Sequence, residues 1–102
     1  MTVEEFIQGN PNRYKINPDF ILRRISGEAV IVPVGESAFG NSMISVNETF
    51  AFLWELFSEP RTLAEAVKLT REEFDAPEGE VESHVVSFVG DALKYGMISK
   101  EE

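Results

Sequence analysis

Histidine and cysteine, two of the residue types most used in catalysis and metal binding, are nearly absent from this chain. His84 is the only histidine, and there is no cysteine. The lack of cysteine excludes a thiol nucleophile, a disulfide, an iron–sulfur cluster and cysteine-ligated zinc within this chain. No HExxH, GxSxG or phosphate-loop pattern is present. The sequence therefore predicts a protein that is not an enzyme and has no catalytic residue, metal or cofactor of its own.

One run of carboxylates stands out, and it allows two interpretations. Its members are close together in the sequence: Glu72, Glu73, Asp75, Glu78, Glu80 and Glu82. They either form a solvated surface near the start of a helix, where negative charge is favourable, or an acidic rim that attracts a basic peptide. The sequence leaves both interpretations open.

The overall charge and hydropathy disfavour two classes of partner. The chain has 18 Asp and Glu against 9 Lys and Arg, which gives a formal net charge of −9. A nucleic acid would meet a repulsive field, so nucleic-acid binding that ignores sequence is disfavoured. The acidic first residues do not resemble a signal peptide, and no apolar run reaches the roughly 18–20 residues of a membrane span. We expect a cytoplasmic protein with neither a nucleic acid nor a membrane as partner.

The elements that must position any site begin with a β-hairpin over residues 20–34. Two runs rich in β-branched and aromatic residues flank Ser26-Gly27, and Gly27 can take the positive φ that a tight hairpin needs. A short third strand is expected over residues 43–46. The early part of the chain therefore predicts a small antiparallel sheet.

Three helices are expected after the sheet, each marked by an N-terminal pattern. Asn47 is a suitable N-cap for the first helix, and Thr62 with Glu65 forms a capping box that opens the second. Asp75 and Glu78 repeat that spacing at the start of the third. The first helix has apolar residues at i, i+3, i+4 and i+7, as a core-facing stripe requires: Phe50, Leu53, Trp54 and Phe57.

The domain organisation follows from these elements. Residues 1–15 are interrupted by glycine, asparagine and proline, so we predict an irregular N-terminal arm there. Residues 16–102 are expected to form a single domain of the α+β class, with a three-stranded antiparallel sheet followed by three helices.

Two expected features point to a binding function. The third strand should leave one edge unpaired, which exposes backbone donors and acceptors to another chain. At about 100° per residue, the third helix is apolar over roughly half its circumference, more than a core-facing stripe needs: Val81, Val85, Val86, Phe88, Val89, Ala92, Leu93 and Tyr95. Together they predict a peptide-binding groove, unless the first two helices cover all of this surface.

Several segments resemble the PqqD-like family, which comprises small recognition domains for the precursor peptides of ribosomally made, post-translationally modified natural products. The resemblance covers about residues 16–98 and is strongest in Asn-x-Thr followed by Leu-Trp. The matching segments are Gly27-Glu-Ala-Val-Ile-Val32, Ile44-Ser-Val-Asn47-Glu-Thr49, Leu53-Trp-Glu-Leu56, Arg61-Thr-Leu-Ala-Glu65, Phe74-Asp75 and Leu93-Lys-Tyr-Gly-Met-Ile98. The resemblance implies the same sheet and three helices in a winged-helix-like arrangement.

The resemblance also implies a function without catalysis. Members of the family bind the leader region of a precursor peptide and present it to a modifying enzyme, often a radical-SAM protein. The leader adds as a strand to the third strand and packs against the third helix. Carried over to this chain, the backbone that pairs with the leader is that of Met43, Ile44, Ser45 and Val46. The helix side chains that line the groove are Val81, His84, Val85 and Phe88.

Two other functions are compatible with the expected element order. One is a winged-helix DNA-binding domain, although its third helix would bring Glu78-Gly-Glu-Val-Glu82 against phosphates of like charge. The other is a dimerising adaptor that uses the same strand edge, so a homodimer is a further candidate assembly.

Overall fold

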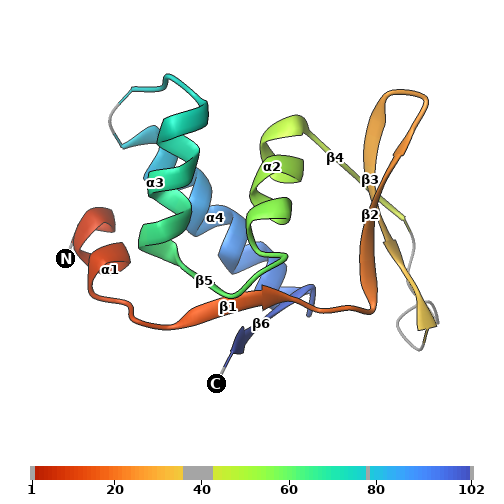
Figure 1. The fold of residues 1–102 in the computed structure, drawn as a ribbon, viewed down its shortest axis with the longest axis horizontal. Helices are drawn as coiled ribbons and strands as arrows, with labels where there is room; N and C mark the ends of the chain where they lie inside the picture. The colour runs from red at the N-terminus through yellow and green to blue at the C-terminus, as the bar shows by residue number, and fades with distance from the viewer. Residues whose placement is uncertain (1, 36–42, 78, 102) are drawn as a thin grey trace.

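The computed structural model describes residues 2–35, 43–77 and 79–101, and within these ranges the chain forms two three-stranded antiparallel sheets and four helices. One sheet stands beside the helices, and the other runs beneath them (Figure 1). The α+β class, with antiparallel strands followed by helices, is therefore confirmed. The full order contains additional elements at both ends of the chain.

The first sheet contains β2 (Phe20–Ile25), β3 (Glu28–Pro33) and β4 (Ile44–Val46), in the order β2-β3-β4. The predicted hairpin is confirmed, because β2 and β3 pair along their length and Ser26 and Gly27 have φ values of 52° and 82°. Glycine takes such a φ without steric cost. The predicted third strand is β4, which pairs with β3.

The helices that follow this sheet are α2 (Glu48–Leu56), α3 (Leu63–Glu73) and α4 (Glu80–Lys94). The Asn47 side chain accepts a hydrogen bond from the Phe50 backbone N–H at 2.8 Å, as an N-cap should. The capping box is also present, because Thr62 and Glu65 each accept from the other's backbone N–H, at 3.1 and 2.9 Å. The hydrogen bond from the Thr62 backbone lowers the pKa of Glu65, and nearby Arg13 lowers it further.

The predicted capping pattern of the third helix is wrong. Glu78 lies outside the described residues, and α4 begins after Gly79, which has a φ of 89° and provides no side-chain cap. The chain after α3 is extended at Phe74, and Ala76 packs against the core. These residues therefore carry the chain from α3 to α4, and a left-handed glycine makes the turn into the helix.

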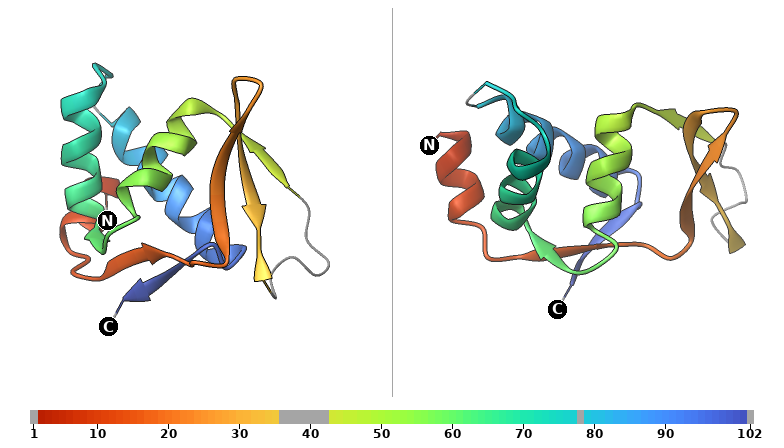
Figure 2. Two further views of the ribbon diagram at one scale, coloured as in Figure 1. Left: turned by 45° about the vertical axis from the view of Figure 1, so that its right-hand side comes forward. Right: turned by 45° about the horizontal axis from the view of Figure 1, so that its top comes forward.

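The prediction of an irregular arm over residues 1–15 is also wrong. Residues Val3–Gln8 form the helix α1, whose N-cap Thr2 accepts from the Glu5 backbone, and Ile7 is buried where α1 packs against α3 and α4. Residues Arg13–Ile16 form β1, the central strand of the second sheet. Both views in Figure 2 show α1 beside α3.

The second sheet escaped prediction because its strands pair across most of the sequence. The short β5 (Arg61–Thr62) and the C-terminal β6 (Ile98–Glu101) lie on either side of β1, in the order β5-β1-β6. Tyr14 pairs with Arg61 on one side and with Lys100 on the other. The residues around positions 13–16 contain no local pattern that predicts pairing with β5 or β6, which lie far away in the sequence.

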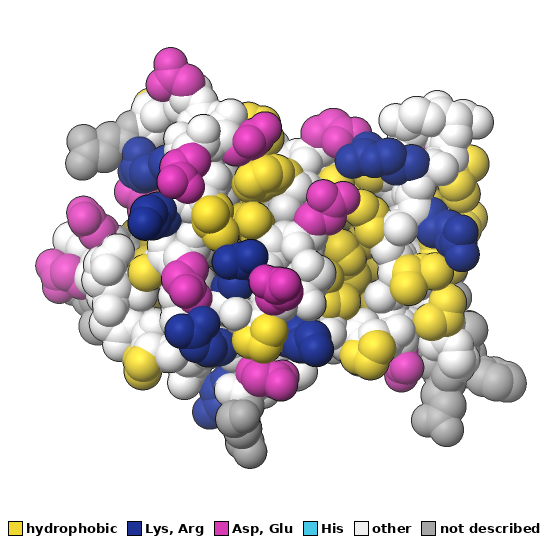
Figure 3. All heavy atoms as spheres, viewed as in Figure 1, with side chains coloured by type: hydrophobic (Ala, Val, Ile, Leu, Met, Phe, Trp, Pro, Cys, Tyr) yellow, Lys and Arg dark blue, Asp and Glu magenta, His cyan; other side chains and the backbone are white. Residues whose placement is uncertain are grey.

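The hydrophobic core lies among the helices and reaches both sheets. Its largest fully buried side chains come from α1, β3, α2, α3, α4 and the residue that follows α2: Ile7, Ile31, Leu53, Leu63, Val85 and Phe57. Hydrophobic side chains also gather in the hollow between α2 and the β2–β3 hairpin, whereas charges of both signs cover the α3 side (Figure 3). The first sheet thus stands slightly apart from the helices, with an apolar seam between them.

Candidate peptide-binding groove

The strand β4 is an edge strand. Among the residues that the structure describes, β3 is the only strand that pairs with it. The register places Ile31 opposite Ile44, and Ala29 opposite Val46. Because side chains alternate across a strand, Ile44 and Val46 share one face of the sheet, and Ser45 points to the other. One backbone edge of β4 therefore has no strand partner among residues 2–35, 43–77 and 79–101.

Two adjoining cavities lie between this strand and α4, and we refer to them together as the β4–α4 groove. The larger cavity has a volume of about 510 Å³ and is lined by Ile44, Ser45, Val46, Asn47, Phe50, Asp91, Ala92, Tyr95 and Met97. The smaller cavity has a volume of about 170 Å³ and is lined by Asn47, Thr49, Phe50, Leu53, His84, Ser87, Phe88 and Asp91. Asn47, Phe50 and Asp91 line both cavities, so the groove is continuous past these three residues.

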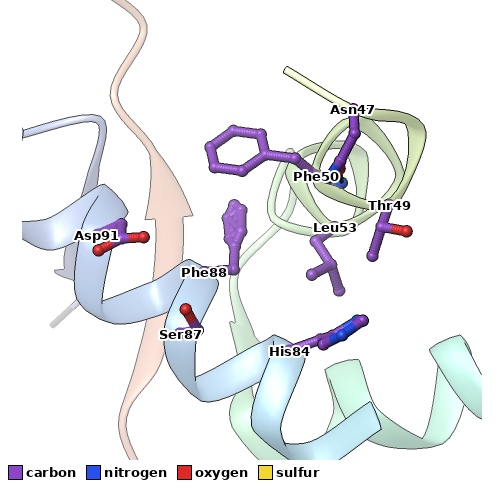
Figure 4. A pocket seen from close by; sticks show the side chains of 8 residues that line it. All are labelled: Asn47, Thr49, Phe50, Leu53, His84, Ser87, Phe88 and Asp91. Atoms are coloured by element: carbon purple, nitrogen blue, oxygen red, sulfur yellow. Dashed lines mark hydrogen bonds between the residues drawn. The ribbon is translucent and has the colours of Figure 1, made fainter. Parts of the chain in front are cut away.

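Phe50 lines both cavities and packs against other aromatic rings. Its ring stacks on Phe88 of α4 with centroids 4.7 Å apart, and it also stacks on Trp54 at 6.4 Å. Figure 4 shows Phe50 and Phe88 directed toward one another from α2 and α4. In the larger cavity, Ala92 and Met97 are buried, whereas Tyr95 is 60% exposed. The groove therefore has apolar walls of fixed position and one exposed aromatic side chain.

A row of polar side chains follows the α4 side of the groove. His84, Ser87 and Asp91 are spaced three and four residues apart, which places them on one face of the helix (Figure 4). All three are exposed. Within residues 2–35, 43–77 and 79–101, no lysine or arginine forms an ion pair with Asp91. The α4 side of the groove thus presents a carboxylate that no cation of the described chain neutralises.

An ion pair connects the first sheet to α2 near the groove. Arg24 on β2 donates to Glu48 on α2 at 2.6 Å. This hydrogen bond raises the pKa of Arg24 and lowers the pKa of Glu48. Both side chains are well exposed, so the pair contributes little to stability, but it links β2 of the first sheet to the first residue of α2.

The structure brings five of the eight predicted site residues to the groove. Ile44, Ser45 and Val46 line it from β4, and His84 and Phe88 line it from α4. Whether they bind a peptide stays a prediction. Met43 precedes β4, is exposed and does not line either cavity.

The placement of Val81 and Val85 in the groove is wrong. Both side chains are buried in the hydrophobic core and line neither cavity, and both α1 and α3 pack against α4. Much of the wide apolar arc of α4 is therefore buried in the hydrophobic core instead of facing the groove. The groove residues of α4 and its C-cap that were not predicted as site residues are Ser87, Asp91, Ala92 and Tyr95. Ala92 and Tyr95 were part of the predicted apolar arc, but nothing in the sequence singled out the two polar residues.

The acidic run is not one surface. Glu82 is only 7% exposed, and both of its carboxylate oxygens accept from the Arg71 guanidinium, the longer of the two distances being 2.7 Å. Glu82 therefore joins α4 to α3 within the structure, and neither sequence interpretation holds for it. Glu72, Glu73, Asp75 and Glu80 are exposed.

Neither a cluster of metal-ligating side chains nor a membrane-spanning helix is found among the described residues. No group of three or more His, Cys, Asp or Glu side chains is placed to hold a metal ion in residues 2–35, 43–77 and 79–101. No helix in the same part of the chain combines the length and the apolar character that crossing a membrane demands.

Comparison with known proteins identifies both a family and a shared fold. The family model described as "Coenzyme PQQ synthesis protein D (PqqD)" matches residues 28–98. No curated protein matches the chain. Among solved structures, TbiB1 in complex with the TbiA(beta) leader peptide has a TM-score of 0.67 and 16% identity, covering 86% of this chain and 98% of its own. Lasso peptide synthetase B1 complexed with the leader peptide has the same TM-score and 13% identity, covering 84% and 96% respectively. At such identities, the two structures demonstrate a common fold.

Proposed function

This chain belongs to the PqqD family, and from that premise we propose that it binds the leader region of a ribosomally made precursor peptide in the β4–α4 groove. We propose that it catalyses no reaction itself. The observation that carries the proposal is the unpaired edge of β4 beside a groove with apolar walls. An extended peptide can use both features at once.

The proposed mode of binding is strand addition to β4. Backbone hydrogen bonds along the edge would fix the register of the peptide, and the side chains that point toward α4 would determine its specificity. Because Ile44 and Val46 share the face that lines the groove, every second side chain of an added strand would point the same way. Phe50, Ala92 and Met97 would then contact apolar leader side chains.

The comparisons support this proposal in two ways. The family match covers the β3 and β4 strands together with all of α2, α3 and α4, and so includes every residue that lines the groove. Both similar structures contain a leader peptide bound to a chain of the same fold. The affinity should be moderate, because a short peptide loses conformational entropy when it becomes ordered on one edge.

Presentation to a modifying enzyme is the second part of the proposal. The groove occupies the side of the domain formed by β4, α2 and α4, whereas α1 and the sheet formed by β5, β1 and β6 lie elsewhere (Figure 1). These elements would remain accessible while a leader is bound. A radical-SAM enzyme is a suitable partner, because this chain has no cysteine and any iron–sulfur cluster must come from another protein. We place both in the cytoplasm, where the cluster would be in a reducing environment.

Amide chemical shifts of the ¹⁵N-labelled protein test the binding proposal. The probes are synthetic leader peptides of the short precursors encoded beside this gene, with a scrambled version of each as the control. We expect the largest shifts at Ile44, Ser45 and Val46 and along α4 between His84 and Tyr95. Shifts confined to α1, or none with any of these peptides, would contradict the proposal.

Two quick measurements separate the alternatives. Light scattering at several concentrations distinguishes a monomeric peptide binder from a dimerising adaptor, since a dimer gives twice the mass. A gel shift at low salt tests DNA binding, and with a net charge of −9 we expect no retardation.

A further inference from the structure

We infer that the β4–α4 groove selects peptides that combine an apolar anchor residue with a basic residue, and that Asp91 recognises the basic one. This inference rests on the proposed function, because it assumes that a peptide occupies the groove. It goes further by naming the chemistry of the segment and the residue that reads it.

Asp91 has the position that such recognition requires. It lines both cavities, together with Phe50 and Asn47, so a side chain in either cavity can approach it. It lies one helical turn from Ser87, as Figure 4 shows, and the same distance along the chain from Tyr95, which follows α4 and lines the larger cavity. The other residues that line the groove are apolar or uncharged, and the nearby Lys94 ammonium lies over the Tyr95 ring, 5.6 Å from its centroid, rather than in an ion pair with Asp91. A bound peptide would partly exclude water from the carboxylate and strengthen an ion pair with it.

The distribution of ion pairs explains why Asp91 stands out among the acids. Glu48, Glu59, Glu65 and Glu82 each pair with an arginine of this chain. None of the residues that line the groove is a lysine or an arginine. The groove therefore has a net negative charge at one point of its wall, and a basic side chain from the peptide complements that charge.

Strand geometry sets the spacing between the two recognised residues. Side chains that share one face of a strand are two positions apart and recur about every 6.6–6.8 Å. An apolar residue directed at Ala92 and Met97 and a basic residue directed at Asp91 must both point toward α4. They should therefore be separated by an even number of positions, two or four, in the peptide sequence.

A displayed library of random 12-residue peptides tests the inference without knowledge of the natural precursor. The library is selected in parallel against the intact protein, against Asp91→Lys and against Asp75→Lys. Asp75 is exposed between α3 and α4, outside the groove, so its variant controls for the same change of net charge. We expect the intact protein and Asp75→Lys to enrich lysine or arginine two or four positions from an apolar residue. Asp91→Lys should lose that preference and favour an acidic residue at the same position.

The outcomes separate the inference from the function on which it rests. Enrichment of apolar peptides with no basic preference, unchanged in Asp91→Lys, would overturn the inference and leave leader binding intact. Enrichment of no peptide by any of the three proteins would overturn the proposed function, and the inference with it.

A titration of one selected peptide gives the size of the effect. Replacing its basic residue by glutamine should weaken binding to the intact protein about two- to fivefold at low salt, as expected for a partly exposed ion pair. The same replacement should change binding to Asp91→Asn by less than that. Equal losses for both proteins would show that the basic residue contacts something other than Asp91, and would overturn the assignment.

Discussion

Truncating Ile44 to alanine tests the groove most directly, because the same truncation at Ile25 gives a matched control. Ile44 lies on β4, lines the larger cavity and is 39% exposed. Ile25 lies at the hairpin end of β2 in the same sheet, is 48% exposed and lines neither cavity. The two variants remove the same atoms from similar surroundings, and only one of them lies where a peptide is proposed to bind.

The expected loss of affinity follows from the exposed fraction of Ile44. The truncation removes three carbon atoms, worth about 2.4 kcal/mol when all are buried, at about 0.8 kcal/mol for each. A bound peptide can newly bury only the 39% that is exposed, which amounts to about 1 kcal/mol. The dissociation constant of Ile44→Ala should therefore rise roughly fivefold.

Both variants should lose a similar amount of stability, so stability alone cannot explain a difference in binding. The part of each side chain that is already buried contributes roughly 1.5 kcal/mol at Ile44 and roughly 1.2 kcal/mol at Ile25, by the same arithmetic. Urea unfolding measures these losses, and isothermal titration with a library-selected peptide measures affinity. Equal weakening by the two variants, or a change below twofold for Ile44→Ala, would refute the reasoning.

Three further perturbations test the elements that support the groove. Arg71→Ala leaves the buried Glu82 carboxylate without its partner. It should lower the free energy of unfolding by about 2–3 kcal/mol, which is less than the loss of one partner of a fully buried pair would cost. In urea unfolding, the double variant that also carries Glu82→Gln should recover part of that loss. Glu65 has a lowered pKa, so the stability that its carboxylate adds should be constant near neutral pH and disappear as the pH falls through that pKa. If the intact protein and Glu65→Gln still differed in free energy of unfolding in acid, this prediction would be wrong. Gly79→Ala should destabilise the protein by about 1 kcal/mol, because Gly79 has a φ of 89°. Gly90→Ala should stabilise the protein by about 0.5–1 kcal/mol, because Gly90 lies within α4 and an added Cβ would have open space around it. Thermal unfolding measures both effects, and shifts of the same sign would refute the argument from φ.

Local chemistry made much of the fold predictable. The hairpin turn at Ser26-Gly27, the N-cap Asn47 and the Thr62–Glu65 capping box each involve residues within three positions of one another. Such patterns can be read from sequence because the interacting groups are close along the chain. The start of α4 could not be read in this way, because Asp75 and Glu78 have the spacing of a capping box but the helix begins only after Gly79.

The remainder of the fold and part of the site depend on contacts between distant segments. The strand β1 exists because β5 and β6 pair with it, and the buried state of Glu82 depends on Arg71 from another helix. The apolar arc of α4 could be counted from the sequence, but its division between core and groove depends on where α1 and α3 pack. As a result, Val85 of this arc lies in the core, whereas the polar Asp91, which is not part of the arc, lines the groove.

Asn47 connects β4, one wall of the β4–α4 groove, directly to the helix α2. This residue follows β4 directly and also caps α2, so no spare residue separates the strand edge from the helix. One inserted residue at this point would invert which β4 side chains face inward, since alternation has a period of two. Substitution of the residues that line the groove would leave this junction intact, whereas a change of chain length at Asn47 would alter which β4 side chains line the groove.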